Sequence, residues 1–468
     1  MTEKPTIVII GGGLSGAAVA YHLAGLLPPG EVDLAVVEPR SELGRGLAYS
    51  AADPDHRLNV PDHKMSLRTD QMDHFQKWLA APHAPVLPAD AADLTGEVFA
   101  PRAMFGSYVA AQLAPLLDHG RIRHVRATVI GIDRDERYTL RLSDGGVLQA
   151  DLIILAATHP KAALPKELAA LSGLAALIAD PLAPTALDGI DPDERILIIG
   201  NGLTSADIVA TLHRRGHRSQ ITALSRHGWR SMPHGPKQGD SAADFANDPA
   251  RTALGLYRRV RQALVIDTAA GLTWHAAFDR LRAQGPAVWA ALPDPERRRV
   301  LRHLRALWDV HRFRIAPQTL YSNLQMQRAG RLTHLAARIT GVQVGATVEV
   351  WLTARHDRLS FPLAVDRIIL ATGPAHGAII AATPALADLA ALGMLQRDPL
   401  GLGLYTLPNG HAVPMNGQPD GSVLIAGPLA RGAVGELMGV PEVISWAEHI
   451  AREAAAQVQL RQSRLIAQ

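Results

Sequence analysis

The stretch "IVIIGGGLSGAAVAYHL", residues 7–23, decides the fold. Its apolar, β-branched start predicts a buried parallel strand, and Gly11, Gly13 and Gly16 follow at once. The alanine-rich residues 17–26 then predict a helix. Glycines at this spacing permit a tight turn, the close approach of a pyrophosphate and tight helix–strand packing, while the helix N-terminus supplies free N–H groups.

A second apolar run, residues 34–37, ends in Glu38, which lies 22 residues after Gly16. A carboxylate at the end of this strand accepts hydrogen bonds from ribose hydroxyls, and its spacing is close to the expected one. A glycine-rich loop alone would be weak evidence. The strand, the helix and the acid together predict a bound adenine dinucleotide.

The stretch "ILIIGNGLTSADIVATL", residues 196–212, repeats the same plan. Its third small residue is Ser205 rather than glycine, and since that position only eases helix–strand packing, a serine requires a modest shift. A second dinucleotide is therefore predicted here. Its predicted contacts are Gly200, Gly202, Leu203, Thr204 and Ser205.

The next strand, residues 220–224, ends in Ser225 and Arg226 where the first unit has Glu38. A carboxylate there would repel a 2′-phosphate, whereas an arginine can bind one through two hydrogen bonds. The second unit is therefore predicted to bind NADPH rather than NADH, with Ser225 and Arg226 as contacts. The alternative interpretation of Arg226 is a solvated loop arginine.

The repetition extends to the strands that close each unit. In each unit, three segments follow the glycine turn and its helix, and together they predict a strand, an antiparallel hairpin and a buried strand ending in Ala-Thr. In the first unit these segments are residues 125–135, 138–145 and 150–160, and in the second unit they are residues 333–344, 347–354 and 365–374. The chain is predicted to be an α/β protein with two Rossmann-like dinucleotide-binding domains, antiparallel hairpin insertions and a helical insertion in the second.

Composition excludes several classes of function. The 468 residues include no cysteine, which removes disulfide-reductase chemistry, iron–sulfur clusters and thiolate zinc sites. The formal net charge is only +3, so no nucleic-acid partner is indicated. No apolar run approaches the roughly 18 residues of a membrane helix. A cytoplasmic protein without a membrane partner is the default expectation.

The two units and their Ala-Thr closures together resemble the two-dinucleotide flavoproteins, in which FAD lies in the first domain and NAD(P)H in the second. Within that group, four stretches are similar to a bacterial FAD/NAD(P)-binding family: residues 44–67, 101–109, 307–317 and 427–439. More remotely, the layout is similar to N-hydroxylating amine monooxygenases and to a flavin-dependent urate hydroxylase. The resemblance implies these domains: FAD-binding at 1–165 and 374–468, and NAD(P)H-binding at 180–373 with a helical insertion at about 240–320.

The resemblance also implies the residues around FAD. Asn59, in an Asn-Val-Pro loop, could bond a ring carbonyl or a peroxide and is a candidate catalytic residue, whereas Met65 is interpreted as packing. Arg45 could neutralise the pyrophosphate or be a surface arginine, and Pro428 stands where many relatives carry an aspartate. The full predicted set is Gly11, Gly13, Leu14, Ser15, Gly16, Glu38, Arg45, Gly46, Asn59, Met65, Arg102, Val129, Gly427 and Pro428.

Residues 240–320 have no counterpart in the first unit and are dense in arginine, mostly in the pattern of a solvated helix face. Before Pro317 the chain crowds four polar residues that could bind a carboxylate or a urate-like anion: Asp309, His311, Arg312 and Arg314. Arg312 is the candidate catalytic residue among them. A helix-end salt-bridge cluster is the alternative, and the ligand spacing of a metal site is lacking.

The resemblance implies that NADPH reduces the flavin, whose C4a-hydroperoxide then oxygenates an amine or heteroaromatic small molecule with O₂. Such chemistry belongs to the cofactor and requires no protein nucleophile. Two alternatives stay open: an NAD(P)H-dependent reductase that serves a redox partner, and a non-catalytic flavin-binding protein, against which the two intact glycine turns argue. The pattern indicates neither the substrate nor the oligomeric state.

Overall fold

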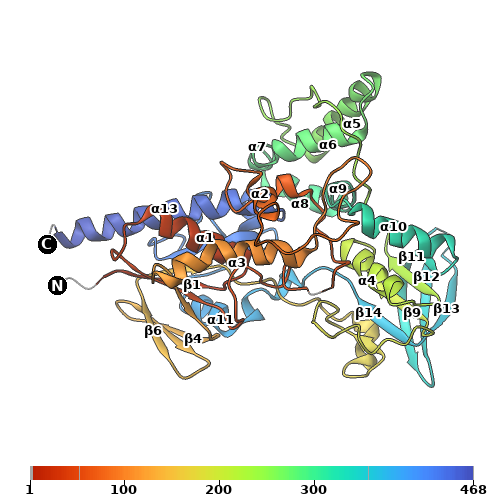
Figure 1. Cartoon of the computed structure of the whole chain (residues 1–468), viewed down its shortest axis with the longest axis horizontal. Helices are drawn as coiled ribbons and strands as arrows, with labels where there is room; N and C mark the ends of the chain where they lie inside the picture. Colours follow the sequence, from red (N-terminus) through yellow and green to blue (C-terminus); the bar gives the residue numbers. More distant parts are fainter. Residues whose placement is uncertain (1–3, 52, 357, 467–468) are drawn as a thin grey trace.

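The computed structural model describes residues 4–51, 53–356 and 358–466. Figure 1 shows three lobes: the first unit with both chain termini on the left, the second unit on the right, and the helical insertion above them. No helix among the described residues is both long and apolar enough to cross a membrane.

The first unit is built on a five-stranded parallel sheet in the order β15-β7-β1-β2-β3. β15 comes from the far end of the chain and pairs with β7, so both ends of the sequence complete this unit. The strands are β1 (Thr6–Ile10), β2 (Asp33–Val37), β3 (Arg123–Val125), β7 (Leu152–Leu155) and β15 (Val423–Ile425).

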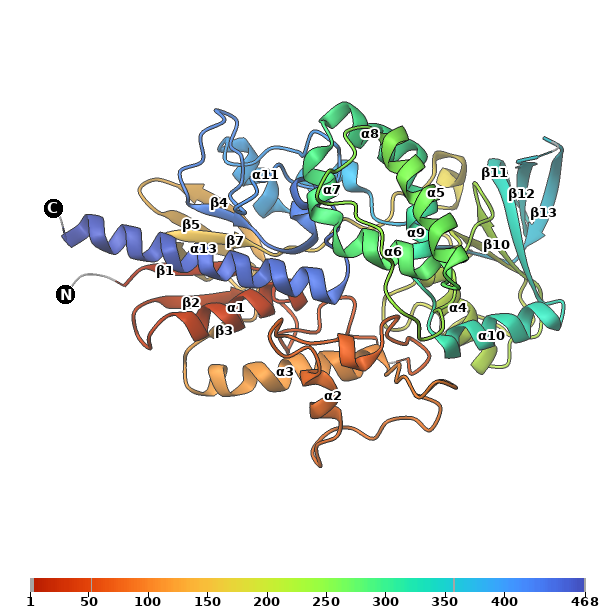
Figure 2. The ribbon, with the colours of Figure 1, turned by 90° about the horizontal axis from the view of Figure 1, so that it is seen from above.

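Helices cover one face of this sheet (Figure 2), and an antiparallel sheet lies on the other. α1 (Leu14–Leu26) is buried along most of its length because it lies between the sheet and the C-terminal helix α13 (Val440–Ile466). The other helices of the unit are η1 (Asp62–Lys64), α2 (His74–Leu79), α3 (Arg102–Asp118), η3 (His376–Ala378), η4 (Ile380–Ala382), α11 (Pro384–Ala391), η5 (Gly427–Ala430) and α12 (Arg431–Val434). A separate antiparallel sheet consists of β4 (Val129–Arg134), β5 (Tyr138–Leu142) and β6 (Val147–Ala150).

The second unit has a seven-stranded sheet in the order β13-β12-β11-β10-β9-β14-β8. The 13-residue β11 runs parallel to β10 in its first part and antiparallel to β12 in its second, so its hairpin continues the main sheet instead of forming a separate one. The strands are β8 (Leu177–Ile178), β9 (Ile196–Ile199), β10 (Ile221–Ser225), β11 (Leu332–Val344), β12 (Val348–Ala354), β13 (Ser360–Val365) and β14 (Arg367–Leu370). The predicted fold, two Rossmann-like units with antiparallel hairpins, is confirmed.

Most of the helices between β10 and β11 form the upper lobe and enclose a small apolar core of their own, and the last of them lies beside the second unit. The helix that follows the second glycine turn, α4 (Leu203–Arg214), packs against the last of them. They are α5 (Ala253–Ala269), α6 (Trp274–Ala283), α7 (Gly285–Ala291), α8 (Asp294–His303), α9 (Arg305–Arg312) and α10 (Pro317–Arg328).

Candidate functional site

The first glycine turn leaves no room for side chains. Gly11 has a φ of +99°, and a Cβ there would lie 2.6 Å from the carbonyl oxygen of Ala156 at the end of β7. A Cβ at Gly16 would lie 1.9 Å from the carbonyl oxygen of Gly11. The chain therefore bends back tightly enough to bring the N-terminus of α1 to the edge of the sheet.

Glu38 is buried at the end of β2 and is held against this turn. Its Oε2 accepts a hydrogen bond from the Gly12 N–H at 2.9 Å, and its Oε1 accepts one from the Arg40 backbone N–H at 3.1 Å. The Arg40 guanidinium also donates to Oε1, at 3.0 Å. Sequence reasoning missed Arg40, although an arginine two residues after the predicted ribose-binding acid was available as a signal.

Two further segments close over the turn. A Cβ at Gly46 would lie 2.9 Å from the Cα of Gly13, and the neighbouring Arg45 donates to the Ser107 hydroxyl at 3.1 Å and lies 2.6 Å from a Glu42 oxygen. On the other side, Gly427 has a φ of +68°, and a Cβ there would lie 2.3 Å from the Ser15 hydroxyl. The structure thus brings Gly46 and Gly427 to the turn; Gly427 is the first residue of η5, and Pro428 follows it.

These residues fit an adenine dinucleotide. No side chain of the described chain caps the N-terminus of α1, so the N–H groups of Leu14, Ser15 and Gly16 remain available to a pyrophosphate. Glu38 offers a carboxylate for ribose hydroxyls. Two other predicted FAD residues, Met65 and Val129, are buried in the hydrophobic core of this unit.

The second turn repeats the first glycine but is less covered. Gly200 has a φ of +122°, and its Cβ would lie 2.2 Å from the carbonyl oxygen of Ala371, the counterpart of Ala156. A Cβ at Gly202 would meet nothing within 4 Å. Ser205 is buried in the first turn of α4, which begins with Leu203 and Thr204 and has no side-chain cap among the described residues. This turn too leaves helix N–H groups for a phosphate.

Asn201 takes the place of Gly12 in the second turn and was missed by sequence reasoning. Its Nδ2 donates to the carbonyl of Gly228 at 3.1 Å, and its Oδ1 accepts from His334 Nδ1 at 2.8 Å. Burial lowers the pKa of His334 to about 4, so this ring is neutral. The middle residue of the "GNG" motif thus fixes the loop after β10 beside the turn.

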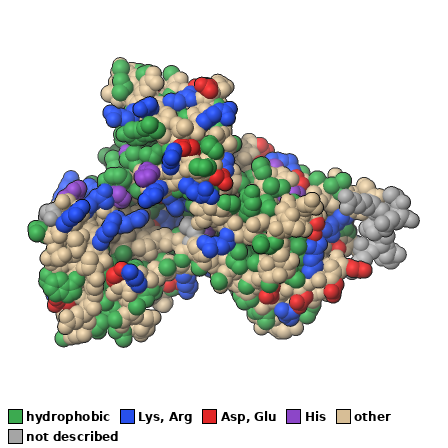
Figure 3. Space-filling model, turned by 180° about the vertical axis from the view of Figure 1, so that it is seen from behind, with side chains coloured by type: hydrophobic (Ala, Val, Ile, Leu, Met, Phe, Trp, Pro, Cys, Tyr) green, Lys and Arg blue, Asp and Glu red, His purple; other side chains and the backbone are tan. Residues whose placement is uncertain are grey.

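That loop carries a cluster of basic side chains. Ser225 Oγ accepts from the Gly228 N–H at 2.9 Å, and Arg355 donates to the Arg226 carbonyl at 3.0 Å. Burial lowers the pKa of His227, and the positive charges of Arg355, Arg226 and Arg338 lower it further. Figure 3 shows basic side chains spread over this unit. Sequence reasoning found Arg226 and missed Arg338 and Arg355, which lie on the hairpin.

Arg102, a predicted FAD contact, lies where the two units meet. Its guanidinium is 2.8 Å from Asp207 on α4, and its Nε donates to the Arg57 carbonyl at 2.9 Å. Burial raises the pKa of Asp207, while Arg102 opposes this rise. Further along α4, the Thr211 hydroxyl donates to Asp53 at 3.0 Å. These contacts dock the helix of the second turn onto the first unit.

Asn59 lies at a second junction. Its carbonyl accepts a hydrogen bond from His234 Nε2 at 3.1 Å, and the His234 ring packs against Phe99 with centroids 4.9 Å apart. Burial lowers the pKa of His234 to about 4, and Arg314 adds to this effect, so the ring is a neutral donor. Sequence reasoning missed His234; its position in a Pro-His-Gly loop was the available signal.

The four residues predicted to bind substrate share the end of α9 but contact different partners. Arg312 is buried, with its guanidinium 3.3 Å from Glu436 and 3.5 Å from Glu442. The others pair or stack locally: Arg314 with Asp279 at 2.7 Å, His311 on the Phe278 ring at 4.6 Å, and Asp309 with Arg305 at 3.5 Å. Arg312 and Arg314 are thus both paired with carboxylates of the protein, as expected for the alternative of a salt-bridge cluster. An anionic substrate would have to compete with these carboxylates.

Residues 8–160 match the family model described as FAD-NAD(P)-binding. The match covers the first glycine turn, Glu38 and the closing strand β7, and it confirms the predicted class of cofactor. No curated protein matches the chain in sequence.

Among solved structures, the chain is similar to L-lysine 6-monooxygenase from Pseudomonas syringae, with a TM-score of 0.64, 17% identity, and 98% of this chain and 99% of that one covered. It is also similar to an ornithine N-hydroxylase from Kutzneria sp. 744 in complex with reduced FAD, NADP⁺ and L-ornithine, with a TM-score of 0.60, 16% identity, and 98% of this chain and 100% of that one covered. The chain is similar as well to a bacillithiol disulfide reductase from Staphylococcus aureus, with a TM-score of 0.55, 13% identity, and 98% of this chain and 99% of that one covered.

The fold and the first site define a flavoprotein architecture with two dinucleotide-binding units. The solved relatives that share it are flavin oxidoreductases, both monooxygenases and disulfide reductases.

Proposed function

We propose that this protein is an FAD-dependent, NADPH-consuming monooxygenase that oxygenates a small molecule, by N-hydroxylation of an amine or hydroxylation of a heteroaromatic ring. The observation that carries the proposal is the contrast between the two turns. The first offers Glu38 inside a closed cradle, which suits a resident FAD. The second has an open turn, and the loop that Asn201 ties to this turn carries Arg226, with Arg355 bonded to the Arg226 carbonyl. This arrangement suits an exchanging NADPH with its 2′-phosphate.

The roles of the chain follow from its donors and acceptors. The N-terminus of α1 would hold the FAD pyrophosphate and Glu38 the ribose, while Arg45 adds a positive charge next to the turn. FAD, when bound, supplies the electron transfer from NADPH and the activation of O₂. His234, held neutral, fixes the Asn59 loop by donating to its carbonyl, so the loop is positioned without placing a charge at the unit junction.

The absence of cysteine favours oxygenation over disulfide reduction. The chain has none, so it lacks a protein dithiol to relay electrons to a disulfide substrate. The oxygenating relatives, named for lysine and ornithine, share the whole architecture. An electron-transfer reductase is the remaining enzymatic alternative.

The test uses the purified full chain supplied with FAD. We expect bound FAD, reduction by NADPH faster than by NADH, and oxygen uptake that matches NADPH consumption. An accepted substrate should lower the hydrogen peroxide yield and give an oxygenated product. An enzyme that reduces an artificial electron acceptor rapidly but O₂ slowly, without any oxygenated product, would be a reductase instead.

A further inference from the structure

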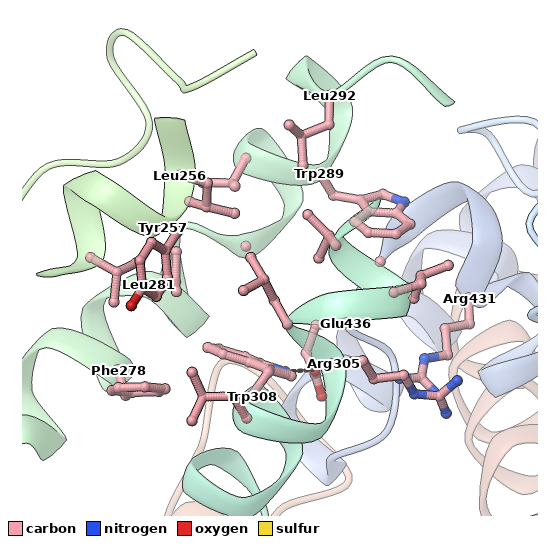
Figure 4. Close-up of a pocket in the computed structure, with 18 of the residues that line it drawn as sticks. Leu256, Tyr257, Phe278, Leu281, Trp289, Leu292, Arg305, Trp308, Arg431 and Glu436 are labelled. Carbon is pink, nitrogen blue, oxygen red and sulfur yellow. Dashed lines mark hydrogen bonds between the residues drawn. The ribbon is translucent and has the colours of Figure 1, made fainter. Parts of the chain in front are cut away.

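The helical insertion contains an apolar cavity of about 160 Å³. Figure 4 shows side chains of α5, α6, α7 and α9 converging on it, among them Leu256, Leu281, Trp289 and Trp308. The segment from Arg431 to Glu436 closes one side, and the Trp289 indole N–H donates to the Gly432 carbonyl at 2.8 Å. A dry cavity of roughly 150 Å³ holds a molecule the size of benzene, so this one accommodates an aryl-sized group.

Two arginines stand at one end of this cavity (Figure 4). Arg305 has a partner, since its Nε lies 3.5 Å from Asp309. Arg431 is only 6% exposed, and among the described residues no carboxylate lies within 4 Å of its guanidinium and its Nε makes no hydrogen bond. A buried cation without an ion-pair partner is costly, which marks Arg431 as a site for an anion.

The two carboxylates that act on the charge of Arg431, those of Glu436 and Asp309, already have other partners. Glu436 lies 3.3 Å from Arg312 and accepts from the Trp308 indole N–H at 3.3 Å. Burial lowers the pKa of Arg431, and Arg305 lowers it further, against the smaller opposing effects of Glu436 and Asp309. The charge on Arg431 is therefore only partly compensated by the protein.

The same segment connects the cavity with the first glycine turn. Gly427, the first residue of η5, packs on Ser15 at the start of α1, and α12 follows η5 without a break. Arg431 comes four residues after Gly427, and Gly435 and Glu436 then line the cavity. A molecule held by Arg431 would thus be one short helical segment from the flavin cradle.

We propose that this cavity binds a small carboxylate with an apolar, aryl-sized body, its carboxylate on Arg431 with Arg305 close by, and its body among the leucine and tryptophan side chains. Resting on the proposed function, this assigns the substrate class. A guanidinium and a carboxylate form paired, charge-assisted hydrogen bonds. The apolar wall would not solvate the second ammonium group of lysine or ornithine, so the preference differs from that of the relatives named for them.

The test compares three probes of equal shape by titration calorimetry on the FAD-loaded full chain: 3-phenylpropanoate, 3-phenylpropan-1-ol and 3-phenylpropylamine. We expect the acid to bind at least about tenfold more tightly than the alcohol, and the amine most weakly, because a hydrogen bond to a charged group contributes about 1.5–3 kcal/mol. Arg431→Met should remove the preference for the acid and change alcohol binding less than about threefold.

Two further variants complete the design. Arg302→Met changes an exposed arginine of the same lobe and should leave all three affinities unchanged. Leu281→Trp, which fills the cavity, should abolish binding of both acid and alcohol. If Arg431→Met does not fold, Arg431→Gln replaces it, with the same expected loss of preference.

Equal binding of acid and alcohol by the wild type, or an acid preference that survives loss of Arg431, would overturn the inference even if NADPH-dependent oxygen uptake is intact. Selective acid binding that depends on Arg431 supports the site. If such binding occurs in a protein that neither consumes NADPH nor oxygenates any compound, the proposed function fails while the cavity site stands.

Discussion

The two glycine turns share one geometry and differ in what surrounds it. Gly11 and Gly200 both face the carbonyl at the end of the closing strand, from Ala156 and Ala371 respectively. In the first turn, however, Gly46 packs against Gly13 and Gly427 packs against Ser15, whereas in the second turn a Cβ at Gly202 would have no neighbour within 4 Å. The strand–turn–helix supplies a phosphate site in both units, and the covering segments decide whether a bound dinucleotide is enclosed or free to exchange.

The strongest test of this comparison is a pair of alanine substitutions, one in each turn. Gly11→Ala puts a Cβ 2.6 Å from a carbonyl oxygen at a φ of +99° and should destabilise the protein by about 3 kcal/mol and abolish FAD retention. Gly202→Ala adds a Cβ in open space at an ordinary φ of −92°, so stability and FAD content should not change. The measurements are bound flavin per chain and denaturant unfolding; equal losses in both variants would contradict the comparison.

The contact that joins the two units gives the next largest effect. Arg102→Met leaves the buried Asp207 without its cation and should cost about 3 kcal/mol, because a buried charge that loses its partner is strongly destabilising. Adding Asp207→Asn should restore much of this loss. The exposed pair Arg218 and Asp193 is the control, and Arg218→Met should cost less than about 1 kcal/mol.

The same variant has a defined pH dependence. Burial raises the pKa of Asp207 in the folded protein, so without Arg102 the folded state holds a proton that the unfolded state has lost above about pH 4. Stability of Arg102→Met relative to wild type should therefore fall as pH rises from about 4 to 8. In the double variant Arg102→Met with Asp207→Asn, this dependence of stability on pH should disappear. If it persists, a group other than Asp207 is responsible for it.

The residue after the second strand of each unit, Glu38 in the first and Arg226 in the second, is expected to determine which dinucleotide the unit binds. Arg226→Ala should weaken NADPH binding by about 10- to 100-fold and leave NADH binding unchanged, since a charged hydrogen bond contributes about 1.5–3 kcal/mol. Arg355→Ala and Arg338→Ala should act in the same direction. Arg328→Ala, an exposed arginine on α10, is the control, and equal weakening of NADPH and NADH would remove the 2′-phosphate assignment.

Features encoded within short segments could be predicted from the sequence. The glycine spacing, Glu38 and Ser225-Arg226 each follow directly from a strand, so their positions at the sheet edge need no tertiary information. Arg355 could not be assigned in this way, because it reaches the Arg226 carbonyl only through the pairing of β11 with β10 and β12.

Long-range packing explains what the local sequence could not show. Arg102 begins the helix that follows Pro101, but its partner Asp207 lies on the other unit, and nothing in either local sequence specifies that pair. The cavity requires several short helices to converge, and an amphipathic pattern predicts each helix without predicting how they meet. The carbonyl contact of His234 with Asn59 likewise depends on how the insertion docks on the first unit.

The smallest expected effect concerns the middle residue of the second turn. Asn201→Gly converts the motif into that of the first unit and removes the hydrogen bonds to Gly228 and from His334. Because a net hydrogen bond contributes about 1 kcal/mol, NADPH affinity should fall about three- to fivefold as the Arg226 loop loses its anchor, while FAD binding is unchanged.

Since Asn201 and His334 share one hydrogen bond, adding His334→Ala to Asn201→Gly should weaken NADPH binding by less than the sum of the two single effects. Full additivity would show that Asn201 and His334 act separately, and that the open turn does not depend on this contact.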